Sequence, residues 1–186
     1  MFFGMPFALF PAIAQGLGGA RVLGLLYTAP AVGSFLFSAT SGWTNRVHRH
    51  GRGVIVAATI WGLAIIGFGL APGLWPALLF LALAGAADMM SGVFRSVIWN
   101  QTIPDSLRGR LAGIEMISYT SGPALGNLEA GVVASLFNVR VSVVSGGVLC
   151  VAGCLLAAIA LPVFRTYDAR LYHLAPEHVP DSVKRE

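Results

Sequence analysis

The chain has 186 residues, of which 56% are hydrophobic and only 11% are charged. A soluble domain has about 25% charged residues and at this size still leaves roughly 30% of its unfolded-chain surface in contact with water, so the composition excludes an ordinary soluble domain and indicates a membrane protein. The formal net charge of +4 does not indicate nucleic-acid binding, because the basic residues are dispersed among apolar runs instead of forming one patch.

The first apolar run, residues 2–14, is too short to cross a bilayer as a helix. A helix of this length is about 20 Å long, whereas the hydrocarbon core is about 30 Å thick. The run lacks the basic region of a secretory signal peptide, and spanning segments follow at once. We therefore expect a partial first helix.

Five longer apolar runs follow, and each is long enough to span a membrane as a helix. They are residues 22–43, 54–71, 74–99, 110–137 and 141–164. We predict an all-α membrane protein whose residues 1–164 form a helical bundle of five full transmembrane helices plus the N-terminal partial helix. Residues 165–186 are polar and contain Pro176 and Pro180, so we expect a polar tail.

The basic residues lie mainly on one of the two sides that these spans define. If every run crosses, nine of the 12 Lys and Arg lie on one side, in the segments 44–53, 100–110 and 165–186. Arg21 and Arg140 lie on the other side, and Arg95 lies within a span. The positive-inside rule then predicts a multi-pass protein of the cell (inner) membrane with a cytoplasmic C-terminus.

Four ionisable residues inside the predicted spans are candidates for function, because a charge at the centre of a membrane helix costs about 2.5–3.5 kcal/mol on insertion scales. They are Asp88, Arg95, Glu115 and Glu129. One interpretation is a pathway for protons and substrate, in which Asp88 or Glu129 binds and releases a proton. For Arg95 and Glu115 we favour the other interpretation, an ion pair that joins two helices. Asp88, within ~3 Å of the midplane, is the residue for which we favour a role in coupling.

Small residues recur every four positions in the run 110–137. Gly122, Gly126 and Ala130 form a GxxxG-like face that lets two helices approach closely. Pro123 removes one helix hydrogen bond and permits a kink. This pattern is typical of close packing, and a kinked gating helix is the alternative.

No set of catalytic residues is recognisable. All four histidines lie in predicted loops or the tail, and the sequence lacks HExxH, a nucleophile elbow and a phosphate-binding glycine loop. Cys150 and Cys154 have no His or acid near them in sequence, so we interpret them as packing residues. We predict that the protein is not an enzyme and expect no cofactor and no metal.

Three segments resemble motifs of the major facilitator superfamily. Phe3-Gly4-Met5-Pro6 resembles the middle of that family's seventh helix, and Pro104-Asp105-Ser106-Leu107-Arg108-Gly109-Arg110 resembles the start of its eleventh. The cytoplasmic loop motif resembles the second copy of the GxxxDRxGRR loop, with Asn45 where an acid is usual. Its residues here, with the two arginines before the eleventh helix, are Gly42, Asn45, Arg46, Gly51, Arg52, Arg108 and Arg110.

The predicted fifth span also resembles the antiporter signature of the family's fifth helix, whose pseudo-symmetric partner is the eleventh. The matching positions are Gly109, Ser118, Gly122, Pro123, Gly126 and Asn127, with Ser118 and Asn127 in place of glycines. From Phe3 to Phe164 the chain therefore resembles the C-terminal six-helix half of such a transporter, in the branch of drug and enterobactin exporters.

This resemblance implies alternating access and proton-coupled efflux of small amphipathic molecules such as siderophores or drugs. Besides the lipid bilayer and the substrate, it implies one further partner, an N-terminal six-helix half encoded upstream in the same gene or supplied as a separate chain. The alternative is a truncated, non-transporting membrane remnant or an interaction subunit.

Overall fold

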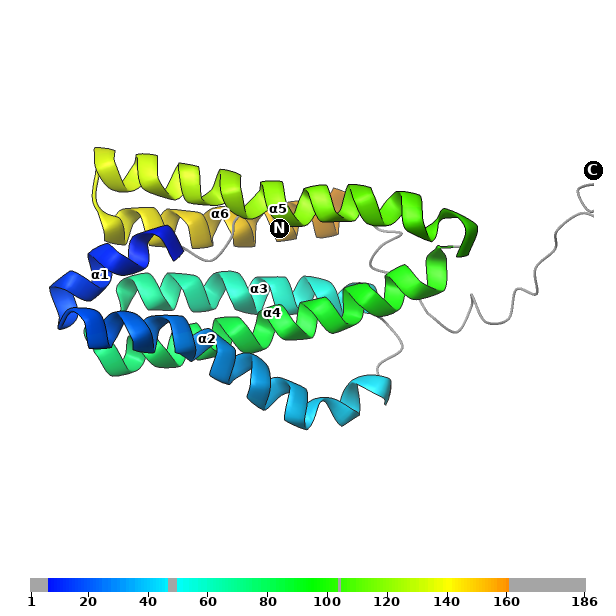
Figure 1. The fold of residues 1–186 in the computed structure, drawn as a ribbon, viewed down its shortest axis with the longest axis horizontal. Helices are drawn as coiled ribbons and strands as arrows, with labels where there is room; N and C mark the ends of the chain where they lie inside the picture. Colours follow the sequence, from blue (N-terminus) through cyan, green and yellow to red (C-terminus); the bar gives the residue numbers. More distant parts are fainter. Residues whose placement is uncertain (1–6, 47–49, 104, 161–186) are drawn as a thin grey trace, which may run out of the picture.

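The computed structural model describes residues 7–46, 50–103 and 105–160, and all regular elements of this part are helical. They are η1 (Phe7–Leu9), α1 (Phe10–Leu17), α2 (Ala20–Thr40), η2 (Ser41–Arg46), α3 (His50–Leu70), α4 (Leu74–Thr102), α5 (Asp105–Leu136) and α6 (Val139–Ala160). The long helices run antiparallel to their sequence neighbours and form one bundle (Figure 1). The predicted tail lies outside the described residues.

Four helices, α2, α3, α4 and α6, are long and apolar enough to cross a membrane. The protein is therefore a multi-pass membrane protein of the all-α class, as the composition predicts. Helix α5 has 32 residues but is not among the four, because serines, glutamates and an asparagine lower its hydropathy. Within the described residues the first apolar segment, Phe7–Leu17, is shorter than a span.

The helix ends differ from the limits of the apolar runs. Helix α3 begins at His50 and α5 at Asp105, whereas hydropathy predicts starts at 54 and 110. Helix α2 ends at Thr40, where the chain continues as the 3-10 helix η2 instead of extending to 43. The reason is that hydropathy marks only the part of a helix that suits hydrocarbon, while the helix itself ends where its backbone hydrogen bonds end.

Other limits move by a few residues. Residues 15–17, which follow the first apolar run, complete α1. The turn before α2 is confined to Gly18 and Gly19, whose φ angles of 136° and 79° suit glycine. Helix α4 continues to Thr102, beyond the predicted 99, and α6 begins at Val139 instead of 141. Residues 161–164, the end of the last predicted span, lie outside the described residues.

Glycines set the crossing of α2 and α4. A Cβ atom on Gly33 would overlap the backbone carbonyl of Ala82, and one on Gly85 would overlap that of Pro30. The Ser34 hydroxyl donates a hydrogen bond of 2.9 Å to the Gly85 carbonyl. The two backbones are therefore in direct contact, the usual use of small residues between membrane helices.

Helix α3 packs against both α4 and α6 and carries much of the core. Trp61 is only 2% exposed, which identifies it as a packing residue. A Cβ atom on Gly147 of α6 would come within 2.9 Å of the Gly62 carbonyl oxygen of α3, so this crossing also depends on glycine. The α2–α4, α3–α4 and α3–α6 contacts are extensive, whereas α4 and α5 make few contacts with each other.

Candidate functional site

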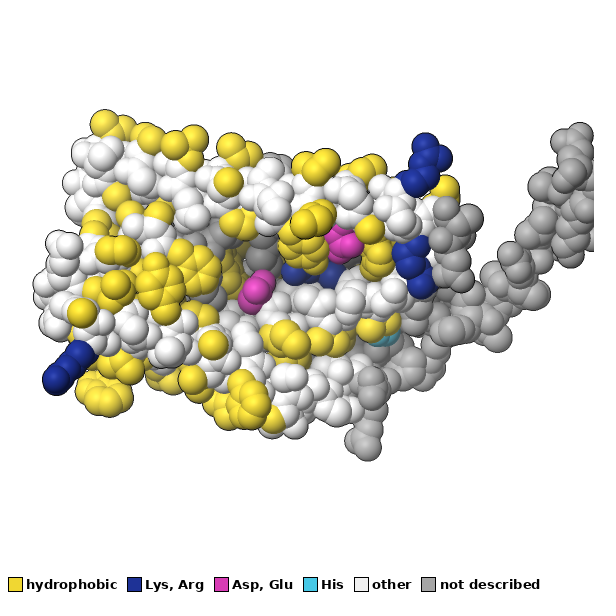
Figure 2. All heavy atoms as spheres, in the orientation of Figure 1, with side chains coloured by type: hydrophobic (Ala, Val, Ile, Leu, Met, Phe, Trp, Pro, Cys, Tyr) yellow, Lys and Arg dark blue, Asp and Glu magenta, His cyan; other side chains and the backbone are white. Residues whose placement is uncertain are grey.

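Charged side chains lie in the middle of one face of the bundle, surrounded by hydrophobic ones (Figure 2). On α4, Asp88 is exposed and Arg95 is half-buried, and their spacing of two helical turns places them on one face. On α5, Glu115 is half-buried. The structure thus brings three of the four candidate ionisable residues to helices that neighbour each other on this face.

Helix α5 presents a continuous stripe that combines residues singled out from the sequence with Tyr119, which is not among them. Successive positions are spaced by four, three, four and three residues, which keeps them on one helix face; they are Glu115, Tyr119, Gly122, Gly126 and Glu129. The two glycines are buried and Glu129 is half-buried. The acidic residues and the small-residue motif therefore belong to one surface, a relationship that the sequence analysis did not recognise.

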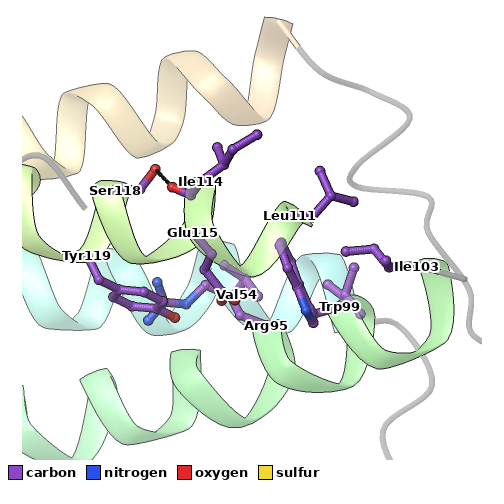
Figure 3. Close-up of a pocket in the computed structure, with 10 residues that line it drawn as sticks. Val54, Arg95, Trp99, Ile103, Leu111, Ile114, Glu115, Ser118 and Tyr119 are labelled. Carbon is purple, nitrogen blue, oxygen red and sulfur yellow. Dashed lines mark hydrogen bonds between the residues drawn. The ribbon is translucent and has the colours of Figure 1, made fainter. Parts of the chain in front are cut away.

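Helices α3, α4 and α5 line an open cavity of about 500 Å³, a size typical of small-molecule sites (Figure 3). Helix α4 supplies Arg95, Ile98 and Trp99, α5 supplies Leu111 to Tyr119, and Val54 of α3 lies behind them. The complete lining is Val54, Arg95, Ile98, Trp99, Ile103, Leu111, Ile114, Glu115, Ser118 and Tyr119. Most of this wall is apolar, with a few polar groups.

Arg95 and Glu115 line this cavity together but form no ion pair in the part of the chain that the structure describes. Instead, the guanidinium carbon of Arg95 lies 5.4 Å from the centre of the Tyr119 ring. The Arg95 Nε donates a hydrogen bond of 3.4 Å to the Ser91 carbonyl of its own helix. The ion pair favoured from the sequence is therefore replaced by a cation–π contact, which the sequence analysis missed because Tyr119 carries no charge. Tyr119 lies about one helical turn after Glu115, and this spacing is the sequence signal that indicates Tyr119 as a part of the site.

Two buried polar atoms have no hydrogen-bond partner among the described residues. They are the hydroxyl of Ser91, which is 0% exposed, and the Oδ1 of Asn127. Ser91 lies between Asp88 and Arg95 on α4, and Asn127 belongs to the small-residue segment of α5. Burying a polar atom without a hydrogen bond costs free energy in a membrane protein. These two atoms add to the polar groups that α4 and α5 already carry.

The small-residue segment of α5 packs partly against α6. Gly122 and Gly126 are buried, and the Ala130 carbonyl accepts a hydrogen bond of 2.7 Å from the Ser142 hydroxyl of α6. Pro123 lies inside α5, which continues as a helix past it, and Gly109 is exposed near the start of α5. The close-packing interpretation agrees with this burial.

The residues of the cytoplasmic loop motif gather at the end of the bundle where α2 and α4 end and α3 and α5 begin (Figure 1). Gly42 lies in η2, Gly51 is buried at the start of α3, and three arginines are exposed: Arg52, Arg108 and Arg110. The Arg108 Nη2 donates a hydrogen bond of 3.5 Å to the Asn100 carbonyl. The side chains of Asn45 and Arg46 lie outside the described part. At the opposite end, Arg21 and Arg140 are exposed.

Within the described ranges, no group of three or more His, Cys, Asp or Glu side chains is placed to hold a metal ion. Cys150 and Cys154 are free thiols on α6, the first buried and the second half-buried.

Comparison with known proteins gives a family match over nearly the whole chain. The model of the Major Facilitator Superfamily matches residues 1–180. The enterobactin exporter EntS of Citrobacter koseri is 31% identical over 150 residues, which cover 80% of this chain and 36% of the exporter. The EntS of Salmonella choleraesuis is 30% identical over 151 residues, with the same shares of 80% and 36%.

The EntS of Escherichia coli O1:K1 is 28% identical over 159 residues, or 84% of this chain and 38% of the exporter. The chain therefore spans little more than a third of the length of the curated relatives that it matches. A search of solved structures finds no significant match.

Proposed function

The chain belongs to the Major Facilitator Superfamily of membrane transporters, and we propose that it forms the C-terminal half of a proton-coupled exporter of small amphipathic molecules. The distant similarity to enterobactin exporters supports export as the direction and siderophores or drugs as substrates. The matched third of those relatives leaves room for a further six-helix half, upstream or on a separate chain, as the partner that completes the substrate pathway.

The observation that carries the proposal is the exposed, charged face of α4 and α5. Asp88 is exposed, and Arg95 and Glu115 are half-buried beside a cavity. A charge that faces lipid at the centre of a span costs about 2.5–3.5 kcal/mol on insertion scales, so membrane proteins turn such residues toward a water-filled cavity or another part of the protein. The face in Figure 2 is therefore best explained as the wall of a pathway that the other half closes.

Under this proposal α5 is the fifth crossing. As a helix of 32 residues it is about 48 Å long, more than the hydrocarbon thickness. Its low hydropathy follows from the polar stripe that contains Glu115 and Glu129, while its exposed Ile117 and Leu128 suit lipid. A helix that lines an aqueous pathway is expected to be polar on one side.

The distribution of arginines supports a cytoplasmic location for the end that carries Arg52, Arg108 and Arg110. Only Arg21 and Arg140 occupy the other end of the described helices. If all five helices from α2 to α6 cross, the chain starts α2 on the side opposite to the cytoplasm and ends α6 in the cytoplasm, which places the C-terminus there.

Asp88 is the residue to which we assign proton coupling, with Glu129 second. Its carboxylate would bind a proton from one side of the membrane and release it to the other as the site changes exposure. Arg95 and Glu115 line the cytoplasmic part of the same pathway, and the buried Gly122 and Gly126, with Pro123 and Asn127, allow α5 to move against its neighbours.

Transport by a complete exporter tests the proposal. This chain would be joined in frame behind the N-terminal half of the Citrobacter koseri exporter, and efflux of enterobactin from vesicles would be measured with and without a pH gradient. We expect gradient-driven efflux that Asp88→Asn abolishes and that the control Ser96→Ala, an exposed polar position on the same helix, leaves intact. Unchanged efflux by Asp88→Asn would remove Asp88 from the mechanism.

A further inference from the structure

We propose that the cavity between α3, α4 and α5 binds an uncharged amphipathic molecule whose polar head both donates and accepts hydrogen bonds. The inference rests on the proposed function, because it names the class of substrate that the exporter half would hold. Binding itself is a property of the cavity and can be measured without transport.

The cavity has the dimensions of a binding site and opens at the polar face. Its volume of about 500 Å³ falls within the usual range of roughly 300–1,000 Å³ for small-molecule sites. Its walls come from three helices, and α4 and α5 stay apart along it although α4 packs tightly on α2 and α3 (Figure 3). A site of this kind holds a ligand mainly by apolar contact and orients it by a few polar groups.

The charged groups of the cavity lie toward one of its ends. Arg95, Glu115 and Tyr119 lie toward the middle of the bundle, whereas Trp99, Ile103 and Leu111 lie toward the turn between α4 and α5 (Figure 3). A phospholipid has the reverse arrangement, because its head group stays at the membrane surface and its chains point to the midplane. The gradient therefore suits a solute that enters with its polar head first, not a lipid.

The two charges in the cavity define the head group. Arg95 has five N–H donors, of which only Nε has a hydrogen bond among the described residues, a long one of 3.4 Å. Glu115 offers acceptors, and no ion pair within the described part of the chain joins it to Arg95. Each charge therefore keeps unused hydrogen-bonding capacity toward the same space.

A ligand of either charge would be attracted by one of the two charged residues and repelled by the other. A carboxylate attracted by Arg95 is repelled by Glu115, and an ammonium group attracted by Glu115 is repelled by Arg95. A hydroxyl or amide head can accept from Arg95 and donate to Glu115 at once. The apolar body would then lie along Ile98 and Trp99, where a flat ring packs well.

Quenching of Trp99 fluorescence measures this binding directly. The chain in nanodiscs would be titrated with 4′-bromobiphenyl-4-ol, the matching 4-carboxylate and the matching 4-methylammonium compound. In the proposed orientation the bromine lies at the apolar end, beside Trp99. We expect saturable quenching by the phenol, with the two charged probes at least about tenfold weaker. Trp99→Phe should remove the saturable component, and empty nanodiscs give the partition background.

Two variants of similar size test the role of each charge. Glu115→Gln should shift the preference toward the carboxylate, and Arg95→Gln should shift it toward the ammonium probe, each by about tenfold. A merely structural role would weaken all three probes alike. Non-saturable quenching by all probes in the wild-type chain, or an unchanged order of affinities in both variants, would overturn the proposal.

The outcome is separable from that of the export proposal. Asp88→Asn should bind the phenol normally, because Asp88 does not line the cavity. Selective binding without proton-driven efflux would refute the exporter alone, and efflux without selective binding would refute the cavity site alone.

Discussion

The guanidinium carbon of Arg95 lies 5.4 Å from the centre of the Tyr119 ring, and this contact links α4 to α5 across the cavity. Cation–π contacts contribute about 0.5–2 kcal/mol, with the larger values where water is excluded. Tyr119 is exposed toward the cavity, and no hydrogen bond of its hydroxyl is found among the described residues. The aromatic face, and not the hydroxyl, is therefore the part of Tyr119 that holds Arg95.

The first prediction follows from that contact. Tyr119→Leu should lower the free energy of unfolding in mixed micelles by about 0.5–2 kcal/mol, because it removes the ring beneath Arg95. Tyr119→Phe keeps the ring and serves as the matched control, with a change near zero. Equal losses in both variants would show that the hydroxyl, and not the ring, is responsible.

The second prediction concerns the crossing of α2 and α4. Gly33→Ala should destabilise the bundle by about 1–3 kcal/mol or more, because its Cβ atom has no room beside the Ala82 backbone. Gly24→Ala on the same helix has open space around it and should be neutral or stabilising, since Ala has the higher helix propensity. Thermal unfolding of the two purified variants gives the comparison. A Gly33→Ala variant as stable as Gly24→Ala would contradict the tight crossing.

The third prediction concerns the hydrogen bond between α6 and α5. Ser142→Ala removes the donor to the Ala130 carbonyl and should cost about 0.6 kcal/mol, with an upper limit of about 1.7 kcal/mol for such bonds in membrane proteins. Ser135→Ala is the control, because that hydroxyl is exposed and bonds within its own helix. Denaturant titration should separate the two variants, and indistinguishable curves would mean that the interhelical bond adds nothing.

The fourth prediction concerns α5 as a crossing. A single cysteine at Asn100, before α5, and one at Asn138, after it, should be labelled from opposite sides of the membrane by an impermeant maleimide. Both side chains are exposed, that of Asn100 near the end of α4 and that of Asn138 between α5 and α6. Labelling of both from the same side would exclude α5 as a span and with it the cytoplasmic C-terminus.

The class of the fold and most of its helices are readable from the sequence because lipid imposes long apolar runs. Helices α2, α3, α4 and α6 satisfy that condition, whereas α5, which its apolar run predicts to be a span, is not apolar enough to be counted with these four. The starts of α3 and α5 are predicted too late, because His50 and Asp105 are polar and hydropathy cannot report a helix outside the hydrocarbon.

The candidate site is predictable only in part. A charged residue in an apolar run is conspicuous, so Asp88, Arg95 and Glu115 are found from the sequence. The contacts between these residues cannot be predicted from the sequence, because the distance between α4 and α5 decides whether Arg95 contacts Glu115 or Tyr119. The glycines that fix the helix crossings are likewise hidden among the 23 of the chain: Gly147 touches α3, while its neighbour Gly146 has nothing within 4 Å.

Water accessibility of position 88 in the complete exporter tests most directly whether the face of α4 and α5 lines a pathway. Asp88→Cys would be compared with Leu63→Cys, an exposed position on α3, in a background that carries Cys150→Ala and Cys154→Ala. A charged methanethiosulfonate reagent reacts with the thiolate, which forms in water and not in lipid. We expect Asp88→Cys to react at least about tenfold faster than Leu63→Cys, and enterobactin to slow only the former. Equal, slow reaction at both positions would mean that Asp88 faces no aqueous pathway.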